Sequence, residues 1–175
     1  MKLLQLLPIG NVDSGPFKEL SLALEEVFSV PCKVLPVRLD PEFAFHDERQ
    51  QYHSSEILQR MQGLVTSETW RMLGIADVDL HIPILTFVFG EAQMSGPCAV
   101  LSSHRLYQEF YGFPPDLKLF RQRLIKESIH ELGHTLNLTH CDDYRCVMAS
   151  SHAVEWIDLK ESALCDSCRS AVMPT

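Results

Sequence analysis

The chain has 175 residues, of which 46% are hydrophobic and 22% charged, as in an ordinary globular protein with room for a sizeable core. Lys and Arg number 15 against 23 Asp and Glu, a net charge of −8, and the basic residues are scattered along the sequence. This balance argues against nucleic acid or an anionic membrane as the main partner. We expect a single domain and a monomer.

The amino-terminal stretch MKLLQLLPIG carries one Lys and a short apolar run that ends at Pro8. It lacks the long apolar segment and the small-residue cleavage site of a secretory signal, and no later run reaches membrane-spanning length. We therefore expect a strand over residues 2–9 and a cytoplasmic location. Disulfides are rare in that compartment, so clustered cysteines are interpreted first as metal ligands.

Capping residues, proline breaks and apolar spacing predict the elements of the first half. These are a helix over 16–30, a strand over 32–39, an exposed polar loop over 43–54, a helix over 54–61 closed by Gly63, a short helix from Thr66 to Gly74, a buried central strand over 84–89 and a strand over 98–103. Strands that alternate with helices predict an α/β fold, with a mixed sheet covered by helices.

A long helix follows Asp116 and has a core-facing stripe at spacings of 4, 3 and 4, formed by Ile125, Ile129, Leu132 and Leu136. Arg123 and Glu127 lie on another face and are interpreted as a surface ion pair. Acceptance of an N–H from a metal-binding His is the alternative role for Glu127. Residues 154–172 are compatible with a closing helix.

His130, Glu131 and His134 form the pattern HExxH on this helix. Residues four apart share a helix face, so both imidazoles can bind one metal ion. Glu131 can then reach a water on that metal without occupying a coordination position. The alternative, a solvated helix face, becomes improbable once the residues that follow are considered.

The pattern continues to His140, giving HExxHxxNxxH. A straight helix would place His140 on the wrong face, so the chain must turn sharply near Asn137. Such turns need a positive φ, which Asn tolerates better than most residues. We therefore predict a three-histidine zinc site with an open coordination position, in which Glu131 is the general base.

Two close cysteine pairs follow, Cys141 with Cys146 and Cys165 with Cys168. In a cytoplasmic chain this spacing is typical of a zinc ion bound by four thiolates, which is structural because no coordination position stays open. A redox pair or buried thiols are the alternatives, although no thioredoxin-like βαβ pattern surrounds Cys165. We thus expect two zinc ions per chain, with His140 and Cys141 serving one each.

These residues together resemble the archaemetzincin family of metzincin zinc metallopeptidases, as do the stretch FVFGEA and the neighbourhood of Ser103. The resemblance implies a metzincin-like fold with an upper subdomain over 1–136 and a lower one over 137–175, on either side of a cleft. It implies that Met148 is the Met-turn residue beneath the catalytic zinc. Asn137 stands where the family usually has Gly, and it meets the same backbone requirement.

The resemblance implies a peptidase that acts on peptides or proteins and could be an aminopeptidase. The strand that contains Ala99, Val100 and Leu101 would form the edge that holds the substrate backbone. A second function class is a zinc-stabilised binding or regulatory protein with little activity. Glu131 favours the peptidase, because a purely structural site needs no general base.

The remaining histidines show no ligand spacing and are interpreted as surface histidines or as histidines with satisfied hydrogen bonds; they are His46, His53, His81, His104 and His152. Cys32 and Cys98 lie in predicted strands and are interpreted as core thiols.

Overall fold

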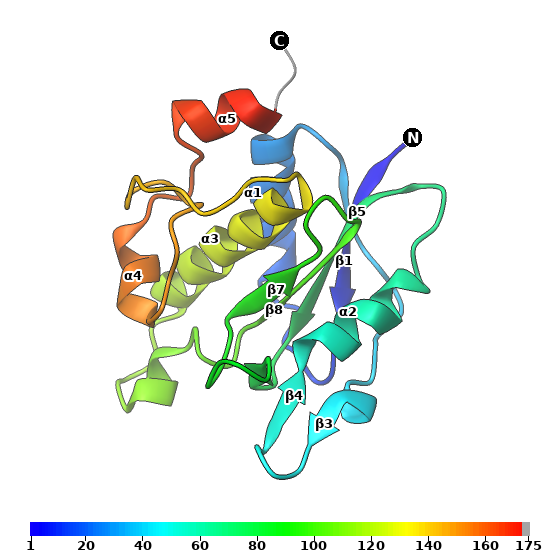
Figure 1. The fold of residues 1–175 in the computed structure, drawn as a ribbon, viewed down its shortest axis with the longest axis vertical. Coiled ribbons are helices and arrows are strands. Elements are labelled where there is room, and N and C mark those ends of the chain that lie inside the picture. Colours follow the sequence, from blue (N-terminus) through cyan, green and yellow to red (C-terminus); the bar gives the residue numbers. More distant parts are fainter. Residues whose placement is uncertain (173–175) are drawn as a thin grey trace.

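The computed structural model describes residues 1–172, and its centre is a twisted five-stranded sheet (Figure 1). The strands lie in the order β2 (Cys32–Val34), β1 (Leu3–Pro8), β5 (Thr69–Ala76), β8 (Cys98–Ser102) and β7 (Gly90–Ala92). Neighbours run parallel, except that β7 is antiparallel to β8. The predicted mixed sheet of an α/β fold is confirmed.

Helices cover both faces of this sheet. Helices α1 (Phe17–Phe28) and α3 (Leu117–Thr135) pack on one face, and α2 (Ser54–Gln62) packs on the other (Figure 1). Side chains of β1 alternate between the two cores, since Leu4 and Leu6 join the first and Leu7 joins the second. Because both faces are covered, β1 is an almost uninterrupted apolar run.

A smaller sheet has the strand order β3 (Phe45–His46), β4 (Gln51–His53) and β6 (Leu80–His81). Strands β3 and β4 lie in the stretch 43–54 that the sequence predicted as an exposed loop, and the 3-10 turn η1 (Glu42–Ala44) precedes them. That prediction was wrong because two- and three-residue strands are too short to show a period of two.

Two further predictions of secondary structure were wrong. The stretch expected as a short helix from Thr66 is the long strand β5, and the expected central strand over 84–89 is a loop whose Ile84 is 86% exposed. Helices α1 and α3 cover one face of β5 and α2 covers the other, so its sequence TWRMLGIA is largely buried on both faces and lacks alternation. Local periodicity cannot separate such a strand from a helix.

The predicted strand over 98–103 exists as β8, but its expected place at the sheet edge was wrong. Leu73 of β5 pairs with Ala99, and Ala92 of β7 pairs with the same residue from the other side. Ala99, Val100 and Leu101 are fully buried and have strands on both sides, so no peptide can add to them. The edge strand on this side of the sheet is β7, and β2 forms the other edge.

The carboxyl-terminal segment contains two short helices rather than one closing helix, α4 (Val154–Leu159) and α5 (Asp166–Val172). The 3-10 turn η2 (Gln108–Tyr111) precedes α3. The lower subdomain was predicted to reach residue 175, and residues 173–175 lie outside the described part. Among residues 1–172, no helix has the length and apolar character needed to cross a membrane.

Candidate metal centres and active site

Helix α3 carries the predicted catalytic residues into the centre of the molecule. Asp116 caps its amino terminus by accepting a hydrogen bond from Leu119 N at 2.9 Å. One turn separates His130 from His134, and their ring centroids are 4.7 Å apart. The four-residue spacing therefore brings both imidazoles together, as the sequence predicted.

The sharp turn after α3 supplies the third histidine. Asn137 has φ 69°, in the left-handed region that the sequence predicted for it. The turn places the His140 ring 5.3 Å from the His130 ring and 5.0 Å from the His134 ring, measured between centroids. One ligand atom of each histidine lies within 4.8 Å of the others. The three side chains could thus hold one metal ion.

Backbone carbonyls orient two of the three rings. His130 Nδ1 donates to Val147 O at 2.9 Å, and His134 Nδ1 donates to Leu138 O at 2.7 Å. A carbonyl can only accept, so both Nε2 atoms carry lone pairs, and these atoms are 3.1 Å apart. Tetrahedral Zn–N bonds of about 2.0–2.1 Å separate two nitrogens by about 3.3 Å. The residues therefore fit a zinc ion.

Burial determines the charge of the residues at this centre. It lowers the pKa of His130, His134 and His140, which keeps the imidazoles neutral as metal ligation requires. Burial, reinforced by the charge of Glu127, raises the pKa of Glu131 well above its usual value. A carboxylate with a raised pKa is a stronger base, so Glu131 is suited to accept a proton from water.

A cleft of about 620 Å³ opens in front of these residues. Strand β7 and the loop that precedes it line the cleft, as do Ser150, Ser151 and His152. Gly90 of β7 touches Glu131 so closely that an added Cβ would lie 2.7 Å from Glu131 Cγ and Oε1. The absence of a side chain at position 90 is what gives the Glu131 carboxylate its space.

A buried ion pair supports the same region. Lys160 Nζ donates to Glu127 Oε1 and to Ala149 O, both at 3.0 Å, and the two charged side chains are 1% and 3% exposed. Arg123 is buried too and pairs with Asp158 at 2.6 Å. The predicted surface pair between Arg123 and Glu127 was therefore wrong. Glu127 does not accept from a ligand histidine, because both Nδ1 atoms bind carbonyls.

Met148 packs against α3 at Gly133. It is fully buried, and a Cβ at Gly133 would collide with its Sδ atom. Gly133 lies between the two helical histidines in sequence, so the methionine occupies the side of the helix where glycine leaves room. This position fits the predicted role of Met148 as the residue under the metal.

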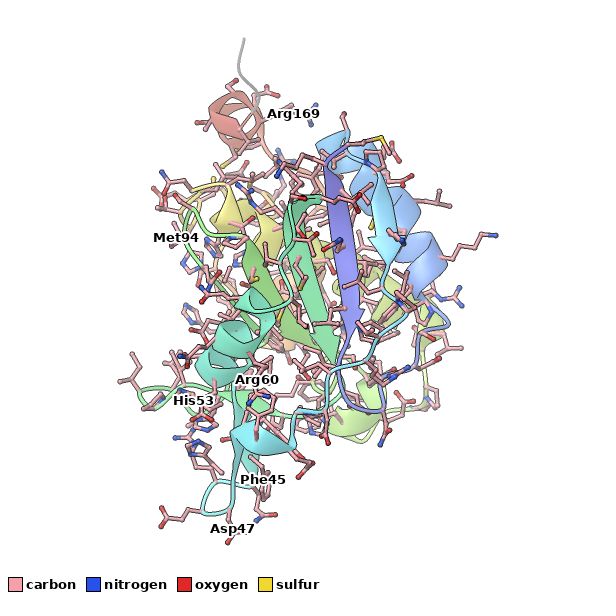
Figure 2. All side chains as sticks on the ribbon, turned by 90° about the vertical axis from the view of Figure 1, so that its right-hand side faces the viewer. Phe45, Asp47, His53, Arg60, Met94 and Arg169 are labelled. Atoms are coloured by element: carbon pink, nitrogen blue, oxygen red, sulfur yellow. The ribbon has the colours of Figure 1, made fainter. Side chains whose placement is uncertain are left out.

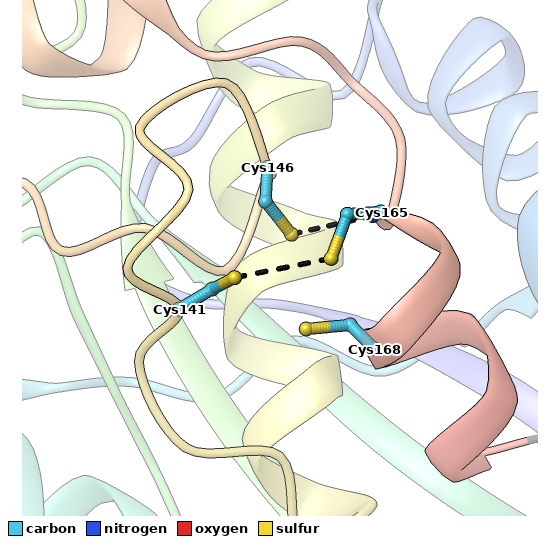
Figure 3. A group of neighbouring side chains, drawn as sticks. All are labelled: Cys141, Cys146, Cys165 and Cys168. Atoms are coloured by element: carbon cyan, nitrogen blue, oxygen red, sulfur yellow. Dashed lines mark hydrogen bonds between the residues drawn. The ribbon is translucent and has the colours of Figure 1, made fainter.

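The four cysteines predicted as thiolate ligands converge in one cluster (Figure 3). Cys141 and Cys146 come from the loop after α3, whereas Cys165 and Cys168 come from the start of α5. The four sulfur atoms all lie within 4.8 Å of one another, and Cys141 Sγ is 3.8 Å from Cys165 Sγ. All four are free thiols, which fits a tetrahedral metal site and not a pair of disulfides.

Comparison with known proteins tests the resemblance seen in the sequence. The family model of peptidase family M54 matches residues 17–173. The archaemetzincin of Methanocaldococcus jannaschii is 40% identical over 161 residues, which cover 92% of this chain and 87% of that protein. The chain belongs to the archaemetzincins, peptidase family M54.

Solved structures agree with this assignment of the chain to the archaemetzincins. A zinc-dependent peptidase from Methanocorpusculum labreanum matches with a TM-score of 0.89 and 26% identity over 97% of this chain and 100% of that one. The archaemetzincin of Methanopyrus kandleri matches with a TM-score of 0.83 and 32% identity over 98% and 93%. The predicted metzincin-like fold is confirmed, and the chain is a zinc metallopeptidase.

Sequence reasoning missed several groups in this archaemetzincin. Neither Gly90 nor Lys160 was predicted from the sequence to be a site residue. His152 lines the cleft although it was expected to be an ordinary surface histidine. His46 and His53 lie together with Glu56, although the sequence showed no ligand spacing for them. The only early signal for Gly90 was its place in the FVFGEA stretch.

Proposed function

We propose that this archaemetzincin hydrolyses peptide bonds at the three-histidine centre, with Glu131 as general acid and base. The observation that supports this most directly is the position of Glu131, buried beside paired imidazole lone pairs at the base of a cleft. A purely structural metal site would need no carboxylate there.

His130, His134 and His140 would hold the zinc ion, as the fit of their nitrogens supports. Bound there, zinc supplies a Lewis acid that polarises a peptide carbonyl and lowers the pKa of a water to about 7. Glu131 takes the proton from the attacking water and delivers it to the leaving amine. Its raised pKa lets it act as a base in the first step and as an acid in the second.

The substrate backbone would lie along β7, the free edge of the sheet. Ser102 N donates to Phe89 O and Gln93 N donates to Cys98 O, so alternate residues of this segment face β8. Gly90 and Ala92 then direct their N–H and C=O groups away from the sheet, and both residues line the cleft. An extended peptide can pair with these groups by β-addition.

The test compares peptide cleavage by the zinc-loaded chain and by Glu131→Gln. We expect kcat to fall by about 10²–10⁴-fold in the variant, the usual contribution of a positioned general acid–base group, with zinc content unchanged. Equal rates in the two proteins, or cleavage by neither over a broad peptide library, would reject the assignment.

An aminopeptidase is the narrower form of this proposal. It predicts cleavage of peptides with a free amino terminus and none of the same peptides after acetylation. Cleavage within the acetylated peptides would identify an endopeptidase instead.

We further propose that the cysteine cluster holds a second, structural zinc. Elemental analysis after gel filtration should give two tightly bound zinc ions per chain. A single ion per chain would contradict this count.

A further inference from the structure

A second set of histidines lies at the other end of the molecule, where the small sheet meets α2. Figure 2 shows His53 at the start of α2, next to the hairpin that carries Phe45 and Asp47. The ring centroid of His46 is 5.4 Å from that of His53 and 5.1 Å from that of His81, and the other two rings are 5.2 Å apart. These separations match those of the catalytic histidines.

Strand register explains why the three rings share one face. His53 of β4 is the direct partner of His81 in parallel β6, so both side chains point the same way. His46 of β3 is the direct partner of Gln51, which is two residues before His53 and therefore on its face. Three adjacent strands thus each contribute one imidazole.

A carboxylate completes the cluster. Glu56 lies three residues after His53, in the first turn of α2, and its Oε1 accepts from His53 Nδ1 at 3.0 Å and from His46 Nε2 at 3.2 Å. One ligand atom from each of these three residues lies within 4.8 Å of the others. The atom separations are those of neighbouring ligands on a tetrahedral ion with bonds of about 2.0–2.1 Å.

His81 provides the second observation. It is only 2% exposed, and neither ring nitrogen has a hydrogen bond of good geometry within residues 1–172. An imidazole buried without a partner loses its hydrogen bonds to water without replacement, a cost that proteins rarely accept without a reason. Its ring stacks on that of His53 at 20°, so His81 packs against the possible ligands with a ring face and is not itself one of the three.

We propose that His46, His53 and Glu56, with His81 behind them, form a third metal site that binds a divalent transition-metal ion such as zinc. Imidazole and carboxylate donors suit ions of the zinc, nickel and copper type. For the ion to bind, the proton on the nitrogen that faces Glu56 moves through solvent to the other nitrogen of each ring, so that two neutral imidazoles direct lone pairs at the ion. The His46 and Glu56 side chains are 43% and 39% exposed. Solvent therefore reaches the bound ion, which can exchange and can bind water at its remaining coordination position.

An ion at this third site joins elements that flank the cleft. Ser54 donates to His81 O and to Glu91, which belongs to edge strand β7. Residue Ile82, next to His81, lines the cleft. The bound ion therefore ties β3, β4 and α2 together, and it acts on β6 and on the loop over 82–89 through the stacking of His53 on His81.

The test uses the full chain without a histidine tag, freed of loosely bound metal by gel filtration. Calorimetric titration with Zn²⁺ should show one additional ion per chain beyond those already bound, and Zn²⁺ should raise the thermal unfolding midpoint. Co²⁺ at this site should lack the sulfur-to-metal charge-transfer absorption of a thiolate site. His53→Ala and Glu56→Gln should each abolish the additional binding.

His104→Gln is the matched control, because His104 lies in another region, where its ring contacts that of Phe110 in an edge arrangement. It should bind the additional ion as the original chain does. Circular dichroism verifies that each variant is folded, and the exposed position of His46 makes His46→Ala a further variant that should lose binding while folding. The proposal is overturned if no additional ion binds, or if binding survives in His53→Ala and Glu56→Gln.

Discussion

Two histidine triads of almost equal dimensions lie in this chain. Ring centroids are 4.7–5.3 Å apart in the catalytic set of His130, His134 and His140, and 5.1–5.4 Å apart in the set formed by the small sheet. The carboxylates differ. Glu131 makes no hydrogen bond to an imidazole in the described part of the chain, whereas Glu56 bonds to two of them.

The two carboxylates are therefore suited to different roles, Glu131 to catalysis and Glu56 to metal binding. A carboxylate that stands beside the metal ligands can move a proton, but a carboxylate that is itself a ligand cannot. The surroundings differ too, since Glu131 is buried and has a raised pKa, while Glu56 is accessible to water. The catalytic set therefore depends on distant buried supports, and the small-sheet set does not. Four substitutions test this dependence.

The largest effect is expected from Cys165→Ser. Structural zinc sites contribute about 10–16 kcal/mol of metal-binding free energy to folding, and a serine removes one of four thiolates. The cluster joins α5 to the loop that begins beside His140, so both stability and peptidase activity should fall. We expect the thermal midpoint to drop by about 10 °C or more, given that each kcal/mol corresponds to about 2–4 °C in a chain of this size.

Cys32→Ser is the matched control, because Cys32 lies in β2 and outside the cluster. It should keep both tightly bound zinc ions, whereas Cys165→Ser should keep one. If Cys165→Ser retained two ions and full activity, the four cysteines would not form a structural zinc site.

Lys160→Met should have the next largest effect. Glu127 would be left as a buried, unpaired charge next to Glu131, which typically costs about 3–5 kcal/mol. Urea unfolding measures this loss. Glu56→Gln breaks an exposed pair and should cost under about 1 kcal/mol without added metal.

The double variant Lys160→Met with Glu127→Leu removes both buried charges and should recover part of the lost stability. A double variant less stable than Lys160→Met alone would show that Glu127 has another essential partner. That result would also weaken the claim that this ion pair supports the catalytic set.

The same comparison shows how far the sequence could predict the site. HExxHxxNxxH and the cysteine pairs lie close together in the chain, so helix periodicity and the turn at Asn137 were enough to assemble them. The strands β1 and β8 and the helices α1, α2 and α3 also had clear local patterns. His46, His53 and His81 are united only by the pairing of short strands, which no local period records.

Local sequence patterns also did not predict which charged residues are buried. Lys160 and Glu127 are charged residues 33 positions apart, and only the packing of α4 against α3 brings them together. Gly90 was missed for the same reason, since its close contact with Glu131 joins an edge strand to a helix.

Gly90→Ala should impair catalysis more than stability. The added Cβ would lie 2.7 Å from Glu131 Cγ and from Val100 O, so the carboxylate must shift. A misplacement of about 1 Å can cost about 10²-fold in rate, and we expect kcat to fall by that order with zinc content unchanged. Gly63→Ala is the control, because a Cβ there meets only Arg60 O at 3.4 Å.

The smallest effects are expected at Asn137. Two substitutions there distinguish a requirement for the backbone conformation from a requirement for the side chain. Its φ of 69° costs an ordinary residue about 1–2 kcal/mol, a cost that glycine avoids. Asn137→Gly should therefore keep activity and zinc content. Asn137→Ala should lower stability by about 1 kcal/mol and weaken zinc binding, because the strained turn presents His140. The opposite result, loss of zinc in Asn137→Gly and retention in Asn137→Ala, would contradict this. The asparagine side chain and not the turn would then position His140, through the contacts of its amide.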